Sequence, residues 1–215
     1  MPAASVGIVV FGDVIASRRL PGGVSVDLRS LARELDGAFE AERLAPFGFT
    51  QGDEVQGLLA TAADPFRAVV RAALRPAPIG LRWAVAAGGI DAGDGPATER
   101  TGDAFLAARE ALTRARTRRD DLVALTGDAE ADGLLADLAP LLAVLLEDLS
   151  ERQRELGRLL LLDGLRRAEA ADRLGVSRAT VSVLADRGRI REIDRLARAL
   201  ATIFGRGVAR LLGTA

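Results

Sequence analysis

The chain contains no cysteine, no histidine and no lysine among its 215 residues. Without cysteine there can be no disulfides, thiolate metal sites or cysteine nucleophiles. Without histidine, proton transfer or metal binding must rest on carboxylates, whose oxygens favour hard ions such as Mg²⁺. No apolar run approaches the roughly 18 residues of a membrane span, and the N-terminus lacks the basic region of a signal peptide. We therefore expect a cytoplasmic protein that does not associate with membranes.

Charge is unevenly distributed along the chain. Residues 150–215 hold 14 arginines against 8 acidic residues, a net charge of +6, whereas residues 1–149 hold 15 against 22, a net charge of −7. A basic C-terminal third joined to an acidic N-terminal part suggests two functions. We predict an α+β domain over residues 1–128, a connecting helix over 129–149 and a DNA-binding domain over 150–215.

The basic third begins with two predicted helices. Ser150 and Gln153 have the spacing of a capping box, in which each side chain bonds the backbone N–H of the other residue, and we expect Gly164 to end this helix. The apolar face of the second helix consists of Ala168, Ala171 and Leu174. Gly175 closes the second helix, because glycine adopts backbone conformations that larger residues resist.

Ser177 begins a third helix, since its hydroxyl is suited to cap an N-terminus, and Val181 and Leu184 follow at helical spacing. Two helices joined by a short turn that contains glycine form the bihelical unit of DNA-binding proteins. The side chains expected to face double-stranded DNA are Ser177, Arg178, Thr180, Ser182 and Arg187. Arginine pairs with guanine edges, while serine and threonine bind phosphates or bases.

The stretch EAADRLGVSRATVSVLADRG, residues 169–188, resembles the helix-turn-helix of sigma-factor region four and related bacterial regulators. The resemblance is confined to the C-terminal third and implies DNA binding. The alternative is a helical hairpin that packs against a partner protein.

Two further segments are predicted to be apolar helices. The stripe that follows Gly188 consists of Ile190, Ile193, Leu196, Ala197, Leu200 and Ile203. It suits either closure of the helix-turn-helix core or a homodimer interface. Residues 129–149 are too apolar for a free linker, and Pro140 is expected to kink or restart the helix there. We interpret this segment as packed between the domains or against a second subunit.

The first 128 residues predict strands at 6–14, 47–51, 55–60, 79–87 and 122–125, with helices between most of them. The order β-α-β-β-α-β-α-β indicates an α+β fold of ferredoxin-like type. Right-handed crossover makes the first two strands parallel and places the third, antiparallel, beside the first. The end of the first strand then meets the turn that begins the third.

That topology brings three carboxylates together: Asp13 from the first strand, and Asp53 and Glu54 from the turn. Adjacent carboxylates repel one another, and a divalent cation such as Mg²⁺ is a common remedy. Because Mg²⁺ often carries substrate phosphates, the site is a candidate for a nucleotide ligand. The alternative is an ordinary hairpin turn beside a strand-end cap.

The motifs FGDVIASRR, FTQGDEVQGLL, LRWAVAAGGI and TGDAFLAAREAL occur in an order that resembles the SatD family of bacterial proteins. Members of that family often carry a C-terminal helix-turn-helix, so the resemblance covers nearly the whole chain. The same order resembles, more distantly, the catalytic domain of class III nucleotidyl cyclases. This second resemblance implies that Asp13 and Asp53 hold metal ions and that Arg109 stabilises charge in the transition state.

Two positions depart from the cyclase pattern. Phe49 stands where cyclases that use ATP place a base-reading lysine, and Phe105 stands where they place an asparagine. Both departures argue against cyclase catalysis. Arg18, which follows the first strand, is a candidate contact for a triphosphate, with a solvated turn as the alternative.

Three classes of function remain. The main hypothesis is a DNA-binding transcriptional regulator whose cyclase-like domain senses a nucleotide with Mg²⁺ or serves as a scaffold. The second is a Mg²⁺-dependent nucleotidyl cyclase or another enzyme that acts on nucleoside triphosphates. The third is an interaction scaffold in which neither site is active.

Overall fold

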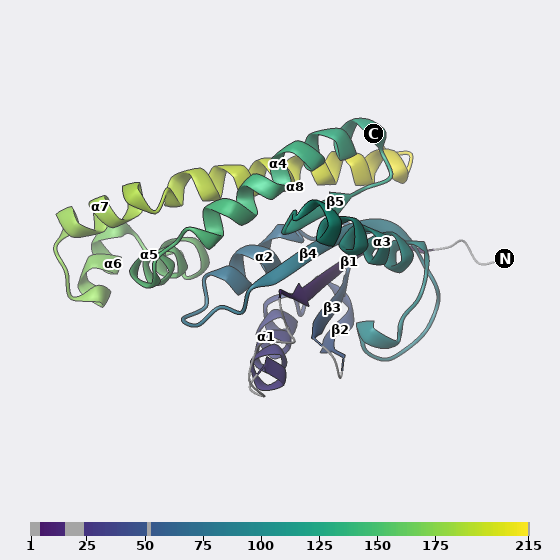
Figure 1. Cartoon of the computed structure of the whole chain (residues 1–215), viewed down its shortest axis with the longest axis horizontal. Coiled ribbons are helices and arrows are strands. Elements are labelled where there is room, and N and C mark those ends of the chain that lie inside the picture. Colours follow the sequence, from purple (N-terminus) through teal and green to yellow (C-terminus); the bar gives the residue numbers. More distant parts are fainter. Residues whose placement is uncertain (1–4, 16–23, 51–52, 215) are drawn as a thin grey trace.

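A computed structural model describes residues 5–15, 24–50 and 53–214 of the chain (Figure 1). Its five strands are β1 (Ser5–Val14), β2 (Arg43–Phe49), β3 (Glu54–Leu59), β4 (Leu81–Ile90) and β5 (Leu122–Leu125). They form one sheet in the order β2-β3-β1-β4-β5, in which only the β4–β5 pair is parallel. The expected α+β class, the element order and the position of β3 antiparallel to β1 are all confirmed.

The edge strand β2 begins four residues before its predicted start at Phe47. Pro46 lies inside it, and the pairing with β3 shifts register between Arg43 and Gly48. Proline is tolerated on an edge strand, where its missing N–H costs no ladder hydrogen bond. The predicted strand, 47–51, therefore lacked the residues on the N-terminal side of Pro46.

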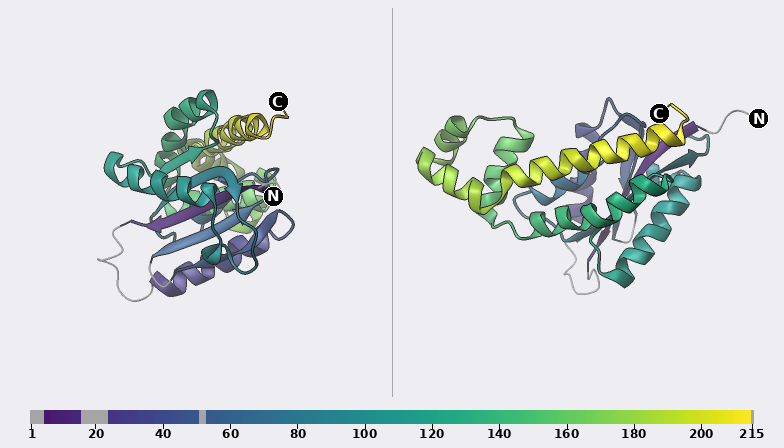
Figure 2. Two further views of the ribbon diagram at one scale, coloured as in Figure 1. Left: turned by 90° about the vertical axis from the view of Figure 1, so that its right-hand side faces the viewer. Right: turned by 90° about the horizontal axis from the view of Figure 1, so that it is seen from above.

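Helices cover both faces of the sheet (Figures 1 and 2). Helices α1 (Val24–Ala38) and α2 (Phe66–Ala73) bury their apolar residues in the core that contains Ile8 and Val10 of β1. Helix α3 (Asp103–Arg118) covers the opposite face, where it packs on Val9 and Phe11 together with a 3₁₀ turn at Ala97–Glu99. Alternate residues of β1 therefore serve two separate cores, as the strand period of two requires.

Helix α4 (Ala129–Glu147) follows β5 and continues through Pro140 without interruption. The side chain of Asp128 caps its start by accepting a hydrogen bond from the backbone N–H of Ala131 at 2.9 Å. Helix α4 packs against β5 and against α8 (Ile190–Leu211), the longest helix of the described residues. The helix predicted over residues 129–149 is present, and it packs within this chain against β5 and α8.

Helix α8 runs back from the C-terminal helices along α4, so that the end of the chain lies beside the start of α4 (Figures 1 and 2). Phe204 of α8 meets Phe66 of α2 edge to face, with ring centroids 5.9 Å apart. Arg210 binds Asp128 at 3.0 Å and Glu130 at 2.7 Å. Helix α8 therefore does more than close the helix-turn-helix, because the second half of this helix packs against the α+β unit.

Three shorter helices complete the chain. Helix α5 (Glu151–Gly157) passes into a π-helical turn at Arg158–Leu162, and α6 (Arg167–Leu174) and α7 (Arg178–Arg187) follow. The predicted capping box is confirmed, since Ser150 and Gln153 exchange side-chain hydrogen bonds with each other's backbone N–H. In the part of the chain that the structure describes, no helix combines the length and the apolarity needed to cross a membrane.

Gly207 of α8 lies in close contact with Thr126 and Ala131. A Cβ atom at this position would lie 2.4 Å from Thr126 Oγ1 and 2.9 Å from Ala131 Cβ. Gly205, two residues earlier in the same helix, has no atom within 4 Å of its Cβ position. Thr126 is fully buried and its hydroxyl donates to Asp132 at 2.8 Å, so it has little freedom to move aside.

Gly207→Ala is expected to lower the free energy of unfolding by about 1–3 kcal/mol, because the added methyl overpacks the α8 contact. Gly205→Ala, the matched control, should raise it by about 0.5–1 kcal/mol through the lower conformational entropy of alanine in the unfolded chain. Urea unfolding of both variants measures the difference. Equal effects of the two substitutions would contradict the placement of α8 against Thr126.

Candidate functional site

The helix-turn-helix predicted from the sequence has the expected local geometry. Gly175 ends α6 in the left-handed conformation, with φ at 65° and ψ at 34°. Ser177 caps α7 by accepting a hydrogen bond from the backbone N–H of Thr180 at 3.1 Å. Ala170 and Ala171 of α6 and Val181 and Ala185 of α7 are buried, and the two helices are in contact. Small residues let the two helices approach closely, and this packing holds α7 in a fixed position against α6.

Most of the predicted DNA-contacting residues are exposed on α7. Ser177, Arg178 and Thr180 lie at its exposed N-terminal end, and Arg187 is exposed in its last turn. Ser182 is only half-buried and lies closer to the helix packing. Arg187 also lines a small cleft with Asp148, at the end of α4. The N-terminal half of α7 is therefore the part most free to meet a ligand.

Sequence reasoning missed one residue on this helix. Val183 is 50% exposed, although valine is normally buried in a helix of this kind. The helical period itself gave the signal, because Val183 falls between the buried positions Val181 and Ala185. An exposed apolar side chain among polar ones suits contact with the methyl group of thymine.

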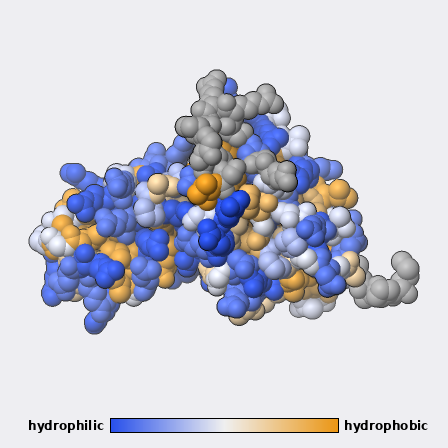
Figure 3. All heavy atoms as spheres, turned by 90° about the horizontal axis from the view of Figure 1, so that it is seen from below, coloured by the Kyte–Doolittle hydropathy of each residue, from blue (hydrophilic) through white to orange (hydrophobic). Residues whose placement is uncertain are grey.

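Several arginines around α6 and α7 carry charge that no described carboxylate neutralises. Five exposed arginines form no ion pair with another described residue; they are Arg167, Arg173, Arg178, Arg187 and Arg189. Polar residues cover much of this end of the molecule (left in Figure 3). Unpaired arginine is the side chain best suited to bind phosphate oxygens.

A second cluster lies where β1 ends beside the start of β3. Asp13 pairs in register with Glu54, and the backbone N–H of Val14 donates to the carbonyl of Asp53 at 2.9 Å. Asp13 and Glu54 are almost fully buried, with 4% and 5% of their surface exposed. The predicted meeting of these strand ends is confirmed. Gln51 and Gly52 of the same turn lie outside the described residues.

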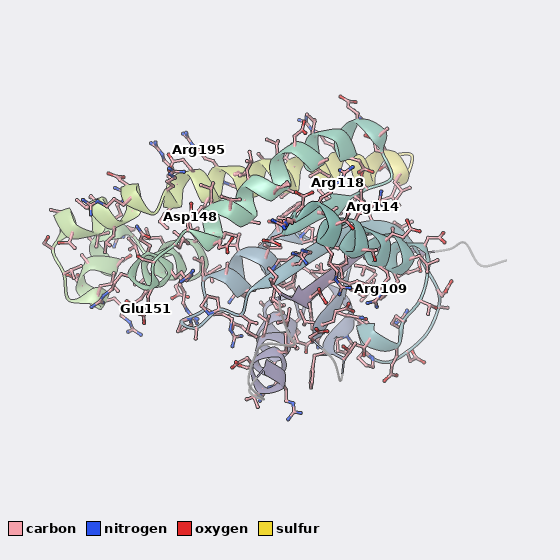
Figure 4. All side chains as sticks on the ribbon, viewed as in Figure 1. Arg109, Arg114, Arg118, Asp148, Glu151 and Arg195 are labelled. Carbon is pink, nitrogen blue, oxygen red and sulfur yellow. The ribbon has the colours of Figure 1, made fainter. Side chains whose placement is uncertain are left out.

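Arginines of α3 bind both buried carboxylates. Arg116 makes a two-pronged contact with Asp13, at 2.7 Å from Nη2 to Oδ1 and 3.2 Å from Nε to Oδ2. Arg109 donates from Nη1 to Glu54 at 2.5 Å and lies 4.8 Å above the ring of Phe11. Figure 4 shows Arg109 on α3, on the side of the helix that faces the sheet.

The clasp between Arg116 and Asp13 is a strong electrostatic contact. The hydrogen bonds from Arg116 to Asp13, and then the charges of Asp13, Asp53 and Glu54, raise the pKa of the Arg116 guanidinium above its ordinary value. Arg116 therefore stays charged at every accessible pH. The side-chain amide of Gln56 donates a hydrogen bond to the other oxygen of Glu54, so both oxygens of this buried carboxylate accept hydrogen bonds.

The two buried carboxylates of this cluster are paired with arginines in the structure. Among residues 5–15, 24–50 and 53–214, no group of three carboxylates lies close enough together to hold a metal. The charge of Asp13 and Glu54 is compensated instead by Arg116 and Arg109. The metal role of Asp13, Asp53 and Glu54 stays a prediction from the sequence.

The nucleotide-binding role of Arg18 and Arg109 also stays a prediction from the sequence. Arg18 lies outside the described residues, and the guanidinium of Arg109 is bound to Glu54. Phe105 is 8% exposed and packs 6.0 Å from Phe11 in the core beneath α3. Phe105 is therefore a core residue, which accounts for the apolar side chain at this position.

Comparison with known proteins gives limited guidance. No protein-family model and no curated protein sequence matches the chain. The structure of a bacterial light-regulated adenylyl cyclase is similar at 17% identity and a TM-score of 0.41, over 55% of this chain and 74% of that one. The crystal structure of a regulator of polyketide synthase expression from Bifidobacterium adolescentis is similar at 17% identity and a TM-score of 0.27, over 92% and 80%. At TM-scores this low, neither likeness bears on what this chain binds, and the resemblance to the SatD family stays a prediction.

Removing Arg116 should be costly because it leaves Asp13 buried and unpaired. Arg116→Met, which keeps the length of the side chain, is expected to lower the free energy of unfolding by about 1–3 kcal/mol at neutral pH. Adding Asp13→Asn to that variant should recover part of the loss, since the buried charge is then gone. Urea unfolding of the two single variants and the double variant gives the coupling. Additive effects of the two substitutions would show that the clasp does not form in solution.

Proposed function

We propose that this protein is a transcriptional regulator that binds double-stranded DNA through α7. The observation that carries the proposal is the bihelical unit of α6 and α7, closed by the left-handed Gly175 and capped by Ser177. In DNA-binding proteins of this build, the second helix enters the major groove and its N-terminal residues contact base edges. In this role we expect it to act on the chromosome in the cytoplasm of a bacterial cell.

The side chains of α7 suit both parts of such an interface. Arg178 is positioned to pair with a guanine edge or a phosphate, and Ser177 and Thr180 suit phosphate contacts. Val183 supplies an apolar contact beside them. The unpaired arginines of α6 and of the α7–α8 turn, Arg173 and Arg189, extend the positive surface for the flanking backbone. Together these residues provide positioning contacts and direct base contacts.

The α+β unit takes the part of a sensor or scaffold in this proposal. The resemblance to the SatD family, whose members often carry a C-terminal helix-turn-helix, supports assigning DNA binding to the C-terminal helices and sensing or scaffolding to the α+β unit. The enzyme hypothesis has less support, because Arg109 and Arg116 neutralise the carboxylates that a metal would need and Phe105 belongs to the core. A homodimer would suit an operator of two half-sites, and the spacing of selected half-sites reports it.

Selection of genomic fragments by the purified protein tests the proposal. Bound fragments are expected to share a sequence motif, and their affinity should fall steeply as salt rises, because bound phosphates release counterions. Enrichment of no motif, together with weak and sequence-independent binding, would leave the C-terminal helices as a protein-contact module.

Arg178→Ala is expected to weaken binding to a selected site and to reduce the slope of log affinity against log salt by about one if it contacts phosphate. If it contacts a guanine, preference at one base position should relax instead, at a cost of about 1–3 kcal/mol. Arg206→Ala is the matched control, since Arg206 is exposed near the far end of α8. Equal losses in the two variants would contradict the assignment of α7.

A further inference from the structure

One side of α4 carries apolar side chains that the described elements leave partly uncovered. Leu134, Leu141 and Val144 are each about half exposed. Leu138 and Leu145, which lie close to them on the helix, are half-buried. The four leucines follow one another at spacings of four, three and four residues, which is typical of a helix side that packs against other helices. An exposed apolar stripe of this kind marks a site of interaction.

This leucine stripe borders α8. Ala131 of α4 lies against Gly207 of α8, where a Cβ atom would be 2.9 Å from Ala131 Cβ. Leu138 and Leu145 follow Ala131 at intervals of seven residues and therefore lie on the same side of α4. Helices α4 and α8 run next to each other, in opposite directions, along one side of the molecule (Figures 1 and 2). The stripe and the exposed side of α8 thus belong to one surface of two helices.

The exposed side of α8 carries small residues. Ala199, Thr202 and Gly205 are exposed at intervals of three residues, and no atom lies within 4 Å of the Cβ position of Gly205. Given the direction of the two helices and the contact at the start of α4, Leu134 lies at about the level of Gly205. Leu141 lies at about the level of Ala199. Large side chains on α4 are therefore level with small ones on α8, so that large meets small when two such surfaces face each other.

The two helices also carry opposite charge. Helix α4 has four acidic residues and no basic one, whereas α8 has five arginines against two acidic residues. Asp148, directly after α4, and Arg195 of α8 are exposed and lie toward the same end of the helix pair (Figure 4). Neither forms an ion pair with another described residue. A second copy of this surface therefore meets opposite charge if its α8 lies over α4, and like charge if its α4 does.

We propose that two copies of this chain pair through this surface, with α4 of each copy lying over α8 of the other. The four helices form an antiparallel bundle whose two-fold axis runs along the helices. The leucine stripe of one copy packs on the small residues of α8 in the other, and Asp148 of one copy pairs with Arg195 of the other. Each contact occurs twice, as in any isologous interface. The spacing of the stripe suits the shallow crossing angles of four-helix bundles.

The area of this surface is sufficient for a specific dimer of moderate affinity. Two helices about 28 Å long and about 9 Å apart present a flat surface of roughly 500 Å². Two copies then bury roughly 1,000 Å² in total, which reaches the lower limit for specific protein interfaces. We therefore expect the dimer to dissociate in the micromolar range.

The orientation of the dimer suits the proposed function. Helices α5, α6 and α7 lie at one end of α4 and α8 (Figure 1). A two-fold axis along the helices brings both helix-turn-helix units to the same end of the dimer, as an operator of two half-sites requires. Pairing of α4 with α4 in opposite directions would place the two units at opposite ends. This consequence rests on the proposed DNA-binding function, whereas the dimer itself does not.

Sedimentation equilibrium of the full chain without DNA tests the dimer. The chain is expected to be dimeric at about 100 μM, and Leu141→Glu should weaken the association roughly tenfold or more, because it places a charge in the apolar contact. Leu106→Glu is the matched control, since Leu106 is even more exposed but lies on α3. A chain that is monomeric at about 100 μM, or equal losses in the two variants, would overturn the proposal.

Both substitutions replace exposed side chains, so neither is expected to unfold the chain, and urea unfolding checks this. If Leu141→Glu does unfold it, Leu134→Glu repeats the test at a second position of the stripe.

A mixture of two charge variants tests which helices meet. Asp148→Arg and Arg195→Glu should each weaken the homodimer roughly three- to tenfold, because like charges then face each other twice. Mixed in equal amounts, the two variants should form a heterodimer nearly as stable as the unaltered dimer, since one of its ion pairs is reversed in sign and the other is unaltered. Mixing does not repair a change within one chain. No recovery on mixing would exclude the placement of α4 over α8 of the other copy.

The role at an operator is measured separately, on selected DNA fragments with one or two half-sites. Leu141→Glu should weaken binding to two half-sites and leave binding to a single half-site unchanged. A dimer that gains nothing from the second half-site keeps the interface and removes its role in DNA binding. If no DNA is bound at all, the proposed function fails, and sedimentation still decides whether the dimer forms.

Discussion

The long contact of α8 with α4 and α2 holds the two parts of the molecule together. The apolar part of this contact consists of Phe204 packed on Phe66 and of Gly207 packed on Thr126. At the end of α8, Arg210 forms ion pairs with Asp128 and Glu130. Burial of apolar area in such a contact contributes roughly 25 cal/mol per Å², whereas exposed ion pairs contribute little. The apolar packing, rather than the arginine contacts, therefore keeps the C-terminal helices docked on the sheet.

This docking changes the meaning of the charge division in the sequence. The acidic and basic parts are not separate domains joined by a flexible linker, because one continuous apolar core includes α1, α2, α4, α5 and α8. The last helix of the basic part is built into the acidic part. In the proposed regulator, a change in the α+β unit would reach the C-terminal helices through packed helices rather than through a loose hinge.

Local signals made the C-terminal helices predictable. Ser150 with Gln153, Gly175 and Ser177 each specify a helix end through their own side chain or backbone freedom, so sequence spacing was sufficient. The strand order followed from the handedness of the crossovers. The Arg116–Asp13 clasp was not predictable, because it joins residues that are far apart in the sequence and depends on the rotation of α3 over the sheet. The contact of α8 with Thr126 was not predictable either, because an apolar stripe on a helix does not indicate which element it packs against. For the same reason the sequence could not show that Phe105 lies in the core, at a position where a polar contact to a nucleotide was considered.

Helix α7 joins α8 through only two residues, Gly188 and Arg189, and Arg189 takes the left-handed conformation with φ at 50°. A 22-residue helix is about 33 Å long. Gly207, which lies against Thr126, is about 25 Å along the helix from its start at Ile190. A tilt of α8 by about 8° about that contact would displace its start at Ile190 by roughly the rise of one base pair along a strand. In the proposed DNA-binding role, close packing at a point remote from α7 would therefore affect the register in which that helix meets a groove.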